Sequence, residues 1–431
     1  MLKLLFVALG EVEVPAYQAL AARLSKSGAV STRIVTLLPR LAQDNVECLE
    51  SIARRTTRNA SVADAVLAAC GYAYRGAAAD YDRDWYFASP EAKSRHVLRV
   101  FSALASVIDN FAPDLLISAV GGETTRMVAE ALAVNRGIER AYFNSIPLPR
   151  RFVLLRSLAA PFIPAKNDLS TSWHPLAHND VVGTGAIGQP PQRASMLDGV
   201  SRAWRRYVAQ EQTYPSGWLS RKTGRLITNR VLSHLPAGGV AYDYAHQQRI
   251  LYPLHDEEDF QVAVRERHAL PQRALVRYLS SVLPWGYHLY LKPHPEHMAS
   301  HHQLLWGEVA KLPNVHFLAS DVKPAAAIEG ADVVFTLASS MGLEALRAGK
   351  PVVCYGRPFY AGRGLTSDVD DPRELANALT AASNFTPPSA EVNNLVEEMM
   401  AWSWPGSFTP LETTAANLDL LASAVEDVLC T

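Results

Sequence analysis

Cysteine, excess charge of one sign and long apolar runs are all scarce in this chain. Its 431 residues include four cysteines, Cys48, Cys70, Cys354 and Cys430, with no CxxC pair and no zinc-ligand spacing. Scattered thiols of this kind are typical of free cysteines in a reducing cytoplasm. The 41 basic residues nearly balance the 42 acidic ones, so the composition excludes the strong positive charge of a bulk nucleic-acid-binding protein.

The N-terminal sequence MLKLLFVALGEVE lacks the features of a membrane span or a secretion signal. Its apolar run stops at Gly10-Glu11, which is too short to cross a bilayer, and no small-residue cleavage site follows. The run instead predicts a first buried parallel strand, followed by a helix over residues 14–24. We therefore predict a cytoplasmic protein.

The pattern of apolar runs predicts two domains, as the length of the chain does. Helical stretches separate most of the predicted strands, and this alternation is typical of doubly wound parallel sheets. Pro-rich turns interrupt the pattern between 145 and 245, where one helix is predicted near 196–212. We predict an α/β fold of two Rossmann-like domains, residues 1–245 and 246–388, facing a central cleft, with a helical tail over 389–431. The predicted strands are residues 3–9, 32–38, 115–120 and 140–144, then 249–254, 287–291, 315–318, 333–337 and 352–355.

Two of these strands end in polar residues that suit an anion. The strand at 287–291 is followed by Lys292-Pro293-His294-Pro295, and the strand at 333–337 by Ala338-Ser339-Ser340 before a helix from Met341. Such units place hydroxyls, backbone N–H groups and a helix N-terminus at the carboxyl edge of a parallel sheet. A nucleotide phosphate is the expected occupant.

The motifs KPHP at 292–295, SSMGLEAL at 339–346 and YGRPFYAGRGLTSD at 355–368 together resemble the capsule polysaccharide biosynthesis family. Members of that family are retaining transferases of Kdo from CMP-Kdo to bacterial surface glycans. The resemblance is dense from about 250 to 368 and thin elsewhere. The chain departs from the family pattern at Arg363, where a Trp is usual, and at His255, where a Gln is usual.

The resemblance implies a cytoplasmic, metal-independent glycosyltransferase of the GT-B type, whose final helices return to the first domain. The CMP-sugar is then a substrate, so no cofactor is expected, and the acceptor is a glycan or glycolipid. A lipid-linked acceptor would require peripheral contact with the inner membrane. The basic stretch 202–206 around Trp204 is a candidate for that contact, although a solvated helix face with one packed Trp is the commoner structure for such a stretch.

The resemblance also assigns roles in a donor site. His294 is the candidate general acid at the departing phosphate, since an imidazole titrates near neutral pH. Ser339 and Ser340 are expected to hold the phosphate, Glu344 to accept from the ribose hydroxyls, and Lys292 to add positive charge. Each residue also has a structural alternative: a His that ends a strand, a Ser pair that caps a helix, or a first-turn acid favoured by the helix dipole.

Retention through a covalent adduct needs a carboxylate nucleophile. Family members place an Asp before a Gly-Val or Gly-Ile pair ahead of the strand that ends in PLQ, and here Asp198-Gly199-Val200 precedes His255 by 57 residues. Asp198 is therefore the candidate nucleophile. Asp243 is the rival, and Asp198 could instead cap a helix beginning at Gly199.

In the first domain, Glu123 of the sequence VGGETTR follows a predicted strand. It is the candidate general base for the acceptor hydroxyl, and Arg126 is the candidate partner of the donor's C1 carboxylate in a bidentate pair. Glu11, at the end of the first strand, is a second candidate. A polar loop or a helix N-terminus is the structural alternative for all three.

No metal site is predicted. Asp80-Tyr81-Asp82 lies in a polar context and not between apolar strand residues. His301 and His302, with His297 nearby, have no acidic or cysteine partner at ligand spacing, so a solvated helix face is predicted for them.

Three alternatives to a Kdo transferase stay open. The donor could be CMP-pseudaminic, CMP-legionaminic or CMP-sialic acid, since the cytidine and phosphate contacts would be shared. A UDP-sugar 2-epimerase has the same two-sheet architecture and a phosphate-binding Ser-Gly pattern. A degenerate transferase domain could also serve only as a scaffold for glycan assembly.

Overall fold

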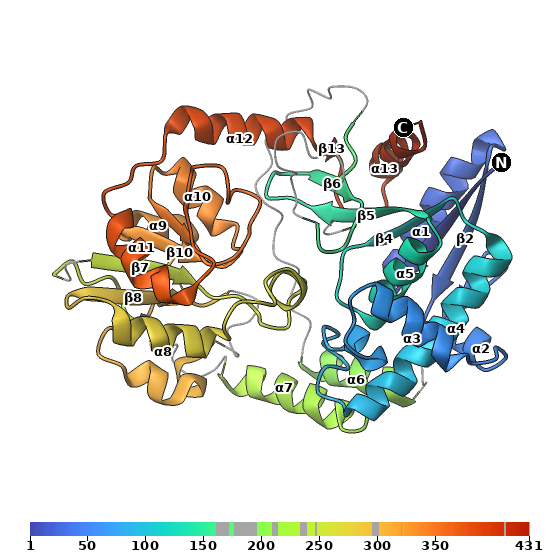
Figure 1. Cartoon of the computed structure of the whole chain (residues 1–431), viewed down its shortest axis with the longest axis horizontal. Coiled ribbons are helices and arrows are strands. Elements are labelled where there is room, and N and C mark those ends of the chain that lie inside the picture. Colours follow the sequence, from blue (N-terminus) through green and yellow to red (C-terminus); the bar gives the residue numbers. More distant parts are fainter. Residues whose placement is uncertain are drawn as a thin grey trace. The chain divides into compact units, whose positions relative to one another are not determined.

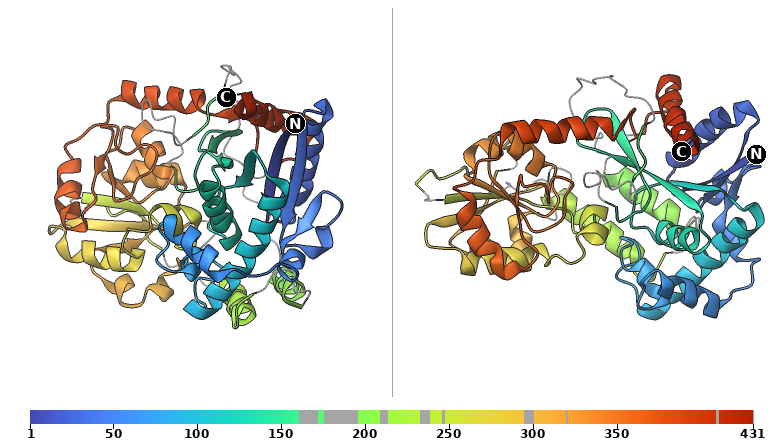
Figure 2. Two further views of the ribbon diagram at one scale, coloured as in Figure 1. Left: turned by 45° about the vertical axis from the view of Figure 1, so that its right-hand side comes forward. Right: turned by 45° about the horizontal axis from the view of Figure 1, so that its top comes forward.

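The computed structural model describes residues 1–160, 172–175, 196–208, 214–232, 239–245, 248–294, 301–319, 321–408 and 411–430. The chain forms two compact units, each built around its own sheet (Figure 1). The first unit comprises Met1–Lys222 and Met399–Thr431, and the second comprises Thr223–Glu398. Both termini lie in the first unit (Figure 2).

The first unit contains a seven-stranded sheet in the order β13-β6-β5-β4-β1-β2-β3. Strands β1 to β5 are parallel, and β6 and β13 are antiparallel to their neighbours. Strand β4 reads LLISA and is buried throughout, as expected where helices cover both faces of a parallel sheet. The strands are β1 (Leu2–Ala8), β2 (Val30–Thr36), β3 (Val46–Cys48), β4 (Leu115–Ala119), β5 (Glu139–Ser145), β6 (Arg151–Leu155) and β13 (Trp404–Pro405).

Helices α1 (Glu13–Leu24) and α13 (Ala415–Cys430) pack against this sheet. Tyr17 of α1 and Val425 of α13 belong to the same buried cluster as Phe143 of β5. The other helices that lie wholly or partly in this unit are α2 (Leu49–Ala53), α3 (Ala60–Ala69), α4 (Pro90–Phe111), α5 (Thr124–Asn135), α6 (Met196–Val208) and α7 (Trp218–Leu232), with 3-10 turns at Ser25–Ser27, Pro39–Leu41 and Arg75–Ala79.

The C-terminal segment from Met399 onward is part of the first unit. The guanidinium of Arg151 on β6 donates to the Ser403 hydroxyl at 2.7 Å and to the Met400 carbonyl at 3.0 Å. The indole of Trp404 donates to Asp427 of α13 at 2.8 Å. The preceding helix, α12 (Ser389–Ala401), therefore crosses the division between the units.

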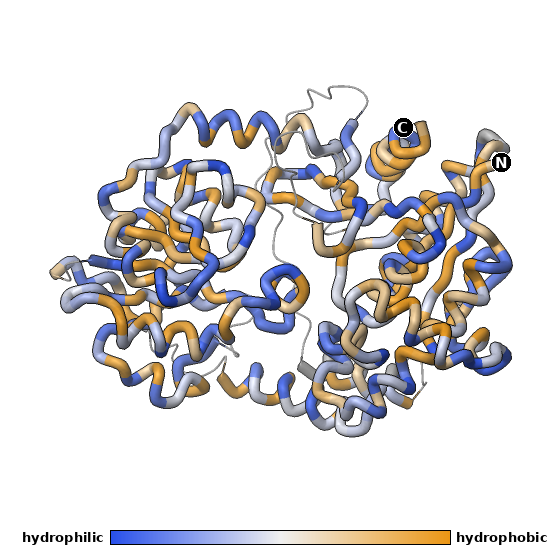
Figure 3. Tube along the Cα trace, viewed as in Figure 1, coloured by the Kyte–Doolittle hydropathy of each residue, from blue (hydrophilic) through white to orange (hydrophobic). Residues whose placement is uncertain are grey.

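The second unit contains a six-stranded parallel sheet in the order β12-β11-β10-β7-β8-β9. Its strands are β7 (Gln248–Pro253), β8 (Tyr287–Lys292), β9 (Val315–Phe317), β10 (Val333–Thr336), β11 (Val352–Cys354) and β12 (Ser367–Asp368). Its helices are α8 (Gln272–Val282), α9 (Pro324–Gly330), α10 (Met341–Arg347) and α11 (Leu375–Ala382), with a π-helical turn at Gln261–Arg265 and 3-10 turns at Gln303–Lys311 and Pro372–Glu374. Apolar residues concentrate in the central strands of both units (Figure 3).

Each sheet reverses its direction of winding beside its first strand. In the first unit the chain runs outward from β1 to β3 and then returns to place β4 on the other side of β1. In the second unit it runs from β7 to β9 and returns to place β10 on the other side of β7. Ligands of doubly wound sheets bind beyond the carboxyl ends of the strands at such switch points.

The predicted α/β fold class, with two Rossmann-like units, is confirmed in these two sheets. Every predicted strand is present within two residues of its predicted ends, whereas β3, β6, β12 and β13 were not predicted. The division between the two units lies within α7 and α12. Within the described residues, no helix combines the length and apolar character that crossing a membrane requires.

Candidate functional site

Three strand-end loops meet at the switch point of the second unit. The backbone N–H of Leu254, after β7, donates to the carbonyl of Lys292, at the end of β8, at 2.9 Å. The ring of His255 reaches the loop after β10, where its Nε2 accepts from the N–H of Ala338 at 3.4 Å. The structure therefore brings the predicted donor-site residues His294, Ser339 and Ser340 to one edge of the sheet.

The two serines at this edge have different surroundings. The Ser339 hydroxyl accepts from the N–H of Met341 at 3.2 Å, so it also caps the start of α10. Ser340 occupies the N-cap position, yet its exposed side chain makes no capping hydrogen bond. The capping alternative thus applies to Ser339, while the Ser340 hydroxyl is accessible to a ligand.

The SSMGLEAL and YGRPFYAGRGLTSD motifs pack directly on each other. The buried hydroxyl of Tyr360 donates to the carbonyl of Ser339 at 2.6 Å. A Cβ on Gly342 would lie 2.1 Å from the same hydroxyl oxygen, so only glycine leaves room for the tyrosine. Gly356 is confined in the same way, because its Cβ would lie 2.3 Å from the Leu337 carbonyl. The roles of Tyr360 and these glycines were not predicted.

Lys292 and Glu344, the other two residues predicted to bind the donor sugar nucleotide, are both at least partly buried. The buried ammonium of Lys292 donates to the carbonyl of Val322 at 2.8 Å. Burial lowers the pKa of Lys292, with Asp321 opposing the shift. Glu344 is half-buried in the first turn of α10, where burial raises the pKa of its carboxyl and Arg347 partly opposes the shift.

Both departures from the family pattern have structural roles. Arg363 donates from Nε to the Phe359 carbonyl at 2.9 Å and forms an ion pair with Glu398 of α12. His255 is held by Gln272, which accepts from its N–H and donates to its carbonyl, both at 2.8 Å. Burial, and then the nearby His294 and His301, lower the pKa of His255 to about 4, so its ring is neutral at physiological pH.

The prediction of a solvated helix face at His301 and His302 is wrong. Both side chains are buried, and the chain forms a 3-10 turn there, capped by the His302 ring, which accepts from the N–H of Leu304 at 3.3 Å. Helical spacing does not reveal that a loop folds inward, and no local signal in the sequence marks this burial.

The first unit contains a cavity of about 230 Å³ beyond the carboxyl ends of β1, β2 and β4. Glu123 and Arg126, both predicted as site residues, line this cavity. Glu11 does not line it; this residue forms an ion pair with Arg40 at 2.5 Å. The other charged or titratable lining residues are Glu13, Glu50, Asp82, Arg83, Asp84, His96 and Arg99.

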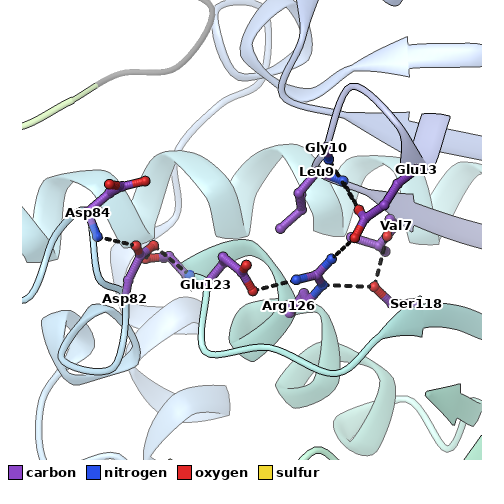
Figure 4. A network of polar contacts seen from close by, with 10 residues as sticks. Val7, Leu9, Gly10, Glu13, Asp82, Asp84, Ser118, Glu123 and Arg126 are labelled. Carbon is purple, nitrogen blue, oxygen red and sulfur yellow. Dashed lines mark hydrogen bonds and ion pairs between the residues drawn. The ribbon is translucent and has the colours of Figure 1, made fainter. Parts of the chain in front are cut away.

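Arg126 lies at the centre of a polar network in this cavity (Figure 4). Its side chain is 4% exposed, and its nitrogens donate to Ser118 at 3.2 Å, Glu123 at 2.5 Å and Glu13 at 2.5 Å. Glu13 also accepts from the N–H of Leu9 at 2.7 Å, which ties the network to the end of β1. All three side-chain nitrogens of Arg126 thus have partners within the first unit, and one of these partners is Glu123.

The ion pair determines the charge of Glu123. Burial alone would raise the pKa of its carboxyl, but Arg126 and Arg83 outweigh burial and lower it. The pKa of Arg126 is raised, because Glu123 and Glu13 outweigh the opposing effect of burial. Glu123 is therefore an ionised carboxylate with a fixed orientation, at the N-cap of α5.

Asp82 is a second carboxyl of the cavity, and its role was not predicted. It is 6% exposed and accepts from the N–H and the hydroxyl of Thr124, both at 2.8 Å, so it caps α5 from a separate loop. The N–H of Asp84 donates to its other oxygen at 2.9 Å. Burial raises the pKa of Asp82 to about 6, against the Thr124 hydrogen bonds.

The two candidate nucleophiles are placed differently. Asp198 lies within α6, two residues after the start of its described part at Met196, and its side chain lies outside the described residues. Asp243 is exposed in a turn of the second unit, where its carboxylate accepts from the N–H of Ala245 at 2.9 Å. Across the described ranges, no three His, Cys, Asp or Glu side chains converge as a metal site.

Residues 211–387 match the model of a family described as capsule polysaccharide biosynthesis protein, which confirms the resemblance indicated by the motifs. The capsule polysaccharide modification protein LipA of Neisseria meningitidis serogroup B is 36% identical over 80 residues, which are 19% of this chain and 11% of LipA. The lipopolysaccharide-processing protein LpsZ of Rhizobium meliloti is 28% identical over 124 residues, which are 28% of this chain and 28% of LpsZ. The match thus spans about a tenth of LipA and under a third of LpsZ.

Among solved structures, a KpsC beta Kdo 2,4 transferase of Thermosulfurimonas dismutans is similar to this chain. The TM-score is 0.36 at 17% sequence identity, and the alignment covers 72% of this chain and 86% of that chain.

Proposed function

We propose that this chain is a glycosyltransferase that moves Kdo, or a related ulosonic acid, from a CMP-activated donor to a bacterial surface-glycan acceptor. The premise is the match of residues 211–387 to the model of the capsule polysaccharide biosynthesis family. The observation that carries the proposal is the meeting of the loops after β7, β8 and β10 at a switch point, with His294, Ser339 and Ser340 on them. Hydroxyl and imidazole groups at this edge suit a phosphate whose charge grows as its bond to the sugar breaks.

In the proposed reaction, the second unit binds the CMP-sugar. Ser340 donates to the phosphate through its exposed hydroxyl, and His294 protonates the departing phosphate. Lys292 adds positive charge at this edge, where its ammonium donates to the Val322 carbonyl. The half-buried Glu344 accepts from the ribose hydroxyls.

We assign the acceptor hydroxyl to the cavity of the first unit. Glu123 is the proposed general base, and Arg126 orients it through the ion pair described above. This assignment replaces the predicted contact of Arg126 with the donor carboxylate by a positioning role. The network supports a fixed base better than a mobile one, because Glu13 and Ser118 fix Arg126 in turn.

Retention of configuration is proposed to proceed through a covalent adduct on Asp198. Asp198→Asn should retain CMP binding and lose transfer, since an amide oxygen is a much poorer nucleophile than a carboxylate. Intact-protein mass spectrometry with donor and no acceptor should show one added sugar on the peptide that contains Asp198. An adduct on Asp243 would move the assignment there.

A panel of nucleotides tests the donor class. CMP should raise the melting temperature more than UMP, UDP or GDP at equal concentration, because a ligand that binds only the folded state stabilises it. The CMP-sugar is the only cosubstrate proposed, and transfer should persist in EDTA. A larger shift with UDP would favour a UDP-sugar 2-epimerase or another UDP-dependent transferase, and CMP binding without transfer to any acceptor would favour a scaffold.

Replacement of His294 tests the chemistry. His294→Ala should lower the rate of transfer by about 10²- to 10⁴-fold, the usual contribution of a general acid. His268→Ala is the matched control, since His268 is an exposed histidine of the same unit. Near-normal transfer by His294→Ala would refute the role of His294.

Peripheral membrane contact and a cytoplasmic location complete the proposal. Trp204 of α6 is 57% exposed, and Tyr207 and Val208 are exposed on the same helix. An exposed Trp beside basic residues supports contact with anionic lipid. Sedimentation with anionic vesicles, compared with neutral vesicles, tests this contact.

A further inference from the structure

His301 is a buried histidine beside the proposed donor site, with no role in the proposed chemistry. It is 4% exposed, although its sequence neighbourhood is polar. Burial of an imidazole costs free energy unless its nitrogens are hydrogen-bonded. Its partners are therefore informative.

Two contacts fix the protonation of the His301 ring. Its Nδ1 accepts from the backbone N–H of His294 at 3.0 Å, so Nδ1 carries no proton. Its Nε2 lies 2.9 Å from the carbonyl oxygen of His255, which can only accept, so Nε2 carries the proton. The partners thus select the neutral Nε2–H tautomer.

These contacts join two strands beyond the end of their ladder. The last residues paired between β7 and β8 are Pro253 and Lys292, and one further bond runs from the Leu254 N–H to the Lys292 carbonyl. After that point the backbones are free to diverge. His301 bridges them there, from the carbonyl of His255 to the N–H of His294.

The bridge continues to the third loop of the site. His255 also accepts from the N–H of Ala338 through its ring, and Ala338 directly precedes Ser339. One line of contacts therefore connects His294, His301, His255 and Ala338. It spans the loops after β8, β7 and β10, on which the proposed acid and the phosphate-binding hydroxyls lie.

We propose that His301 is a positioning residue, which holds the His294 loop in register with the phosphate-binding loop after β10. The inference rests on the proposed function of His294. Because the bridge fixes the backbone of His294 and not a substrate, its loss should reduce turnover more than donor affinity. A displacement of the order of 1 Å in a catalytic group can cost about 10²-fold in rate.

Two substitutions at position 301 separate positioning from packing. His301→Leu fills much of the same volume but offers no acceptor and no donor. His301→Gln carries an amide oxygen and an amide N–H side by side, so it can accept from His294 and donate to His255. His302→Leu is the matched control, because His302 is also buried but caps the adjacent 3-10 turn.

The first measurement is independent of any substrate. The backbone N–H of His294 should exchange with solvent at least tenfold faster in His301→Leu than in the wild type, whereas His301→Gln and His302→Leu should retain its protection. Unchanged protection of His294 in His301→Leu would overturn the inference.

The second measurement is steady-state transfer well below the melting temperature. His301→Leu should lower kcat by about 10- to 10²-fold with little change in the KM for the donor. His301→Gln should recover most of kcat, and His302→Leu should keep it. Wild-type kcat in His301→Leu, or equal losses in the Leu and Gln variants, would overturn the inference.

A double variant distinguishes failure of the inference from failure of the proposed function. If His301 acts through His294, then His301→Leu should have no further effect on kcat in a His294→Ala background. A full additional loss there would overturn the inference and leave the role of His294 intact. Normal transfer by His294→Ala alone would instead refute the proposed function.

Discussion

Asp82 should make the stability of the first unit fall as the pH rises. Burial raises its pKa from 3.8 to about 6, Asp84 adds to this shift, and the Thr124 hydrogen bonds oppose it. A shift of about two pKa units corresponds to about 3 kcal/mol. The unfolded chain loses this proton near pH 4 and the folded chain near pH 6, so the folded chain holds more protons between these values. The free energy of unfolding therefore decreases from about pH 4 to about pH 6, and this contribution is constant above that range.

Asp82→Asn isolates this contribution. The neutral amide resembles the protonated carboxyl, because its oxygen can accept from Thr124 while its NH₂ group opposes the N–H of Asp84. The two proteins should therefore have similar free energies of unfolding at pH 4. By pH 7 the variant should be the more stable by about 3 kcal/mol, because only the wild type then buries a charge at this position.

Urea denaturation followed by circular dichroism, in steps from pH 4 to pH 7, measures this difference. Most other groups titrate alike in both proteins, so the difference between the two curves reports Asp82. If the difference in free energy of unfolding between the two proteins stays constant to within about 0.5 kcal/mol from pH 4 to pH 7, the raised pKa of Asp82 is refuted. If the free energy of unfolding of the wild type instead increases relative to that of the variant as the pH rises, the hydrogen bonds from Thr124 stabilise the Asp82 carboxylate more than burial destabilises it.

Two further predictions concern packing and the cavity network. Gly342→Ala should lower the free energy of unfolding by about 1–3 kcal/mol, as overpacking usually does. It should also weaken CMP binding, because the new methyl group displaces the Tyr360 hydroxyl from the loop after β10. Urea denaturation measures the first effect and calorimetry with CMP the second. Glu13→Gln should lower the free energy of unfolding by about 1–3 kcal/mol, since it sets an amide donor against the buried Arg126 and leaves a hydrogen bond unmade. Urea denaturation measures this change, and a loss below about 0.5 kcal/mol would refute the contribution of the network to stability.

Each of these substitutions has a control in the same unit. Among the described residues, a Cβ at Gly224 in α7 would meet no atom within 4 Å beyond its chain neighbours and its own helix backbone, and Gly224 has no positive φ. Gly224→Ala should therefore be neutral or stabilise the helix by up to about 1 kcal/mol. Glu11→Gln weakens a half-exposed ion pair with Arg40, for which a loss below about 1 kcal/mol is expected.

The central strands could be predicted from the sequence because each is a short apolar run buried on both faces. VVFT at β10 and LLISA at β4 are examples. The edge strands could not be predicted in this way. Strand β13 has two residues, and its pairing of Trp404 with Phe152 joins positions about 250 residues apart. A sequence window around WSWP contains no trace of that partner.

The positions of the proposed donor-site residues were easier to predict than the network of the first unit. His294 and Ser339 follow predicted strands directly, so their edge of the sheet follows from the strand ends alone. Glu13 is recessed into the first turn of α1 and reaches back to the N–H of Leu9. From the sequence, Glu11 was named as a second candidate base and Glu13 was not singled out. A strand end is visible in a pattern, whereas the direction of a side chain from the following helix is not.

The motifs that resemble those of the capsule polysaccharide biosynthesis family pack against one another. Gly342 of SSMGLEAL is small because the Tyr360 hydroxyl of YGRPFY occupies the space where its Cβ would lie. Gly356 is small because the Leu337 carbonyl and Glu266 occupy the space beside it, and Glu266 also accepts from the N–H of Arg357 at 2.8 Å. A substitution in one motif without a matching change in the other would therefore disturb the loop that carries Ser339. This holds even if Gly342, Gly356 and Tyr360 make no contact with a donor. Substitution of Tyr360 by Phe keeps the ring but removes the hydroxyl that bonds the Ser339 carbonyl and interacts with Thr336. It therefore separates the shape of this packing unit from its polarity.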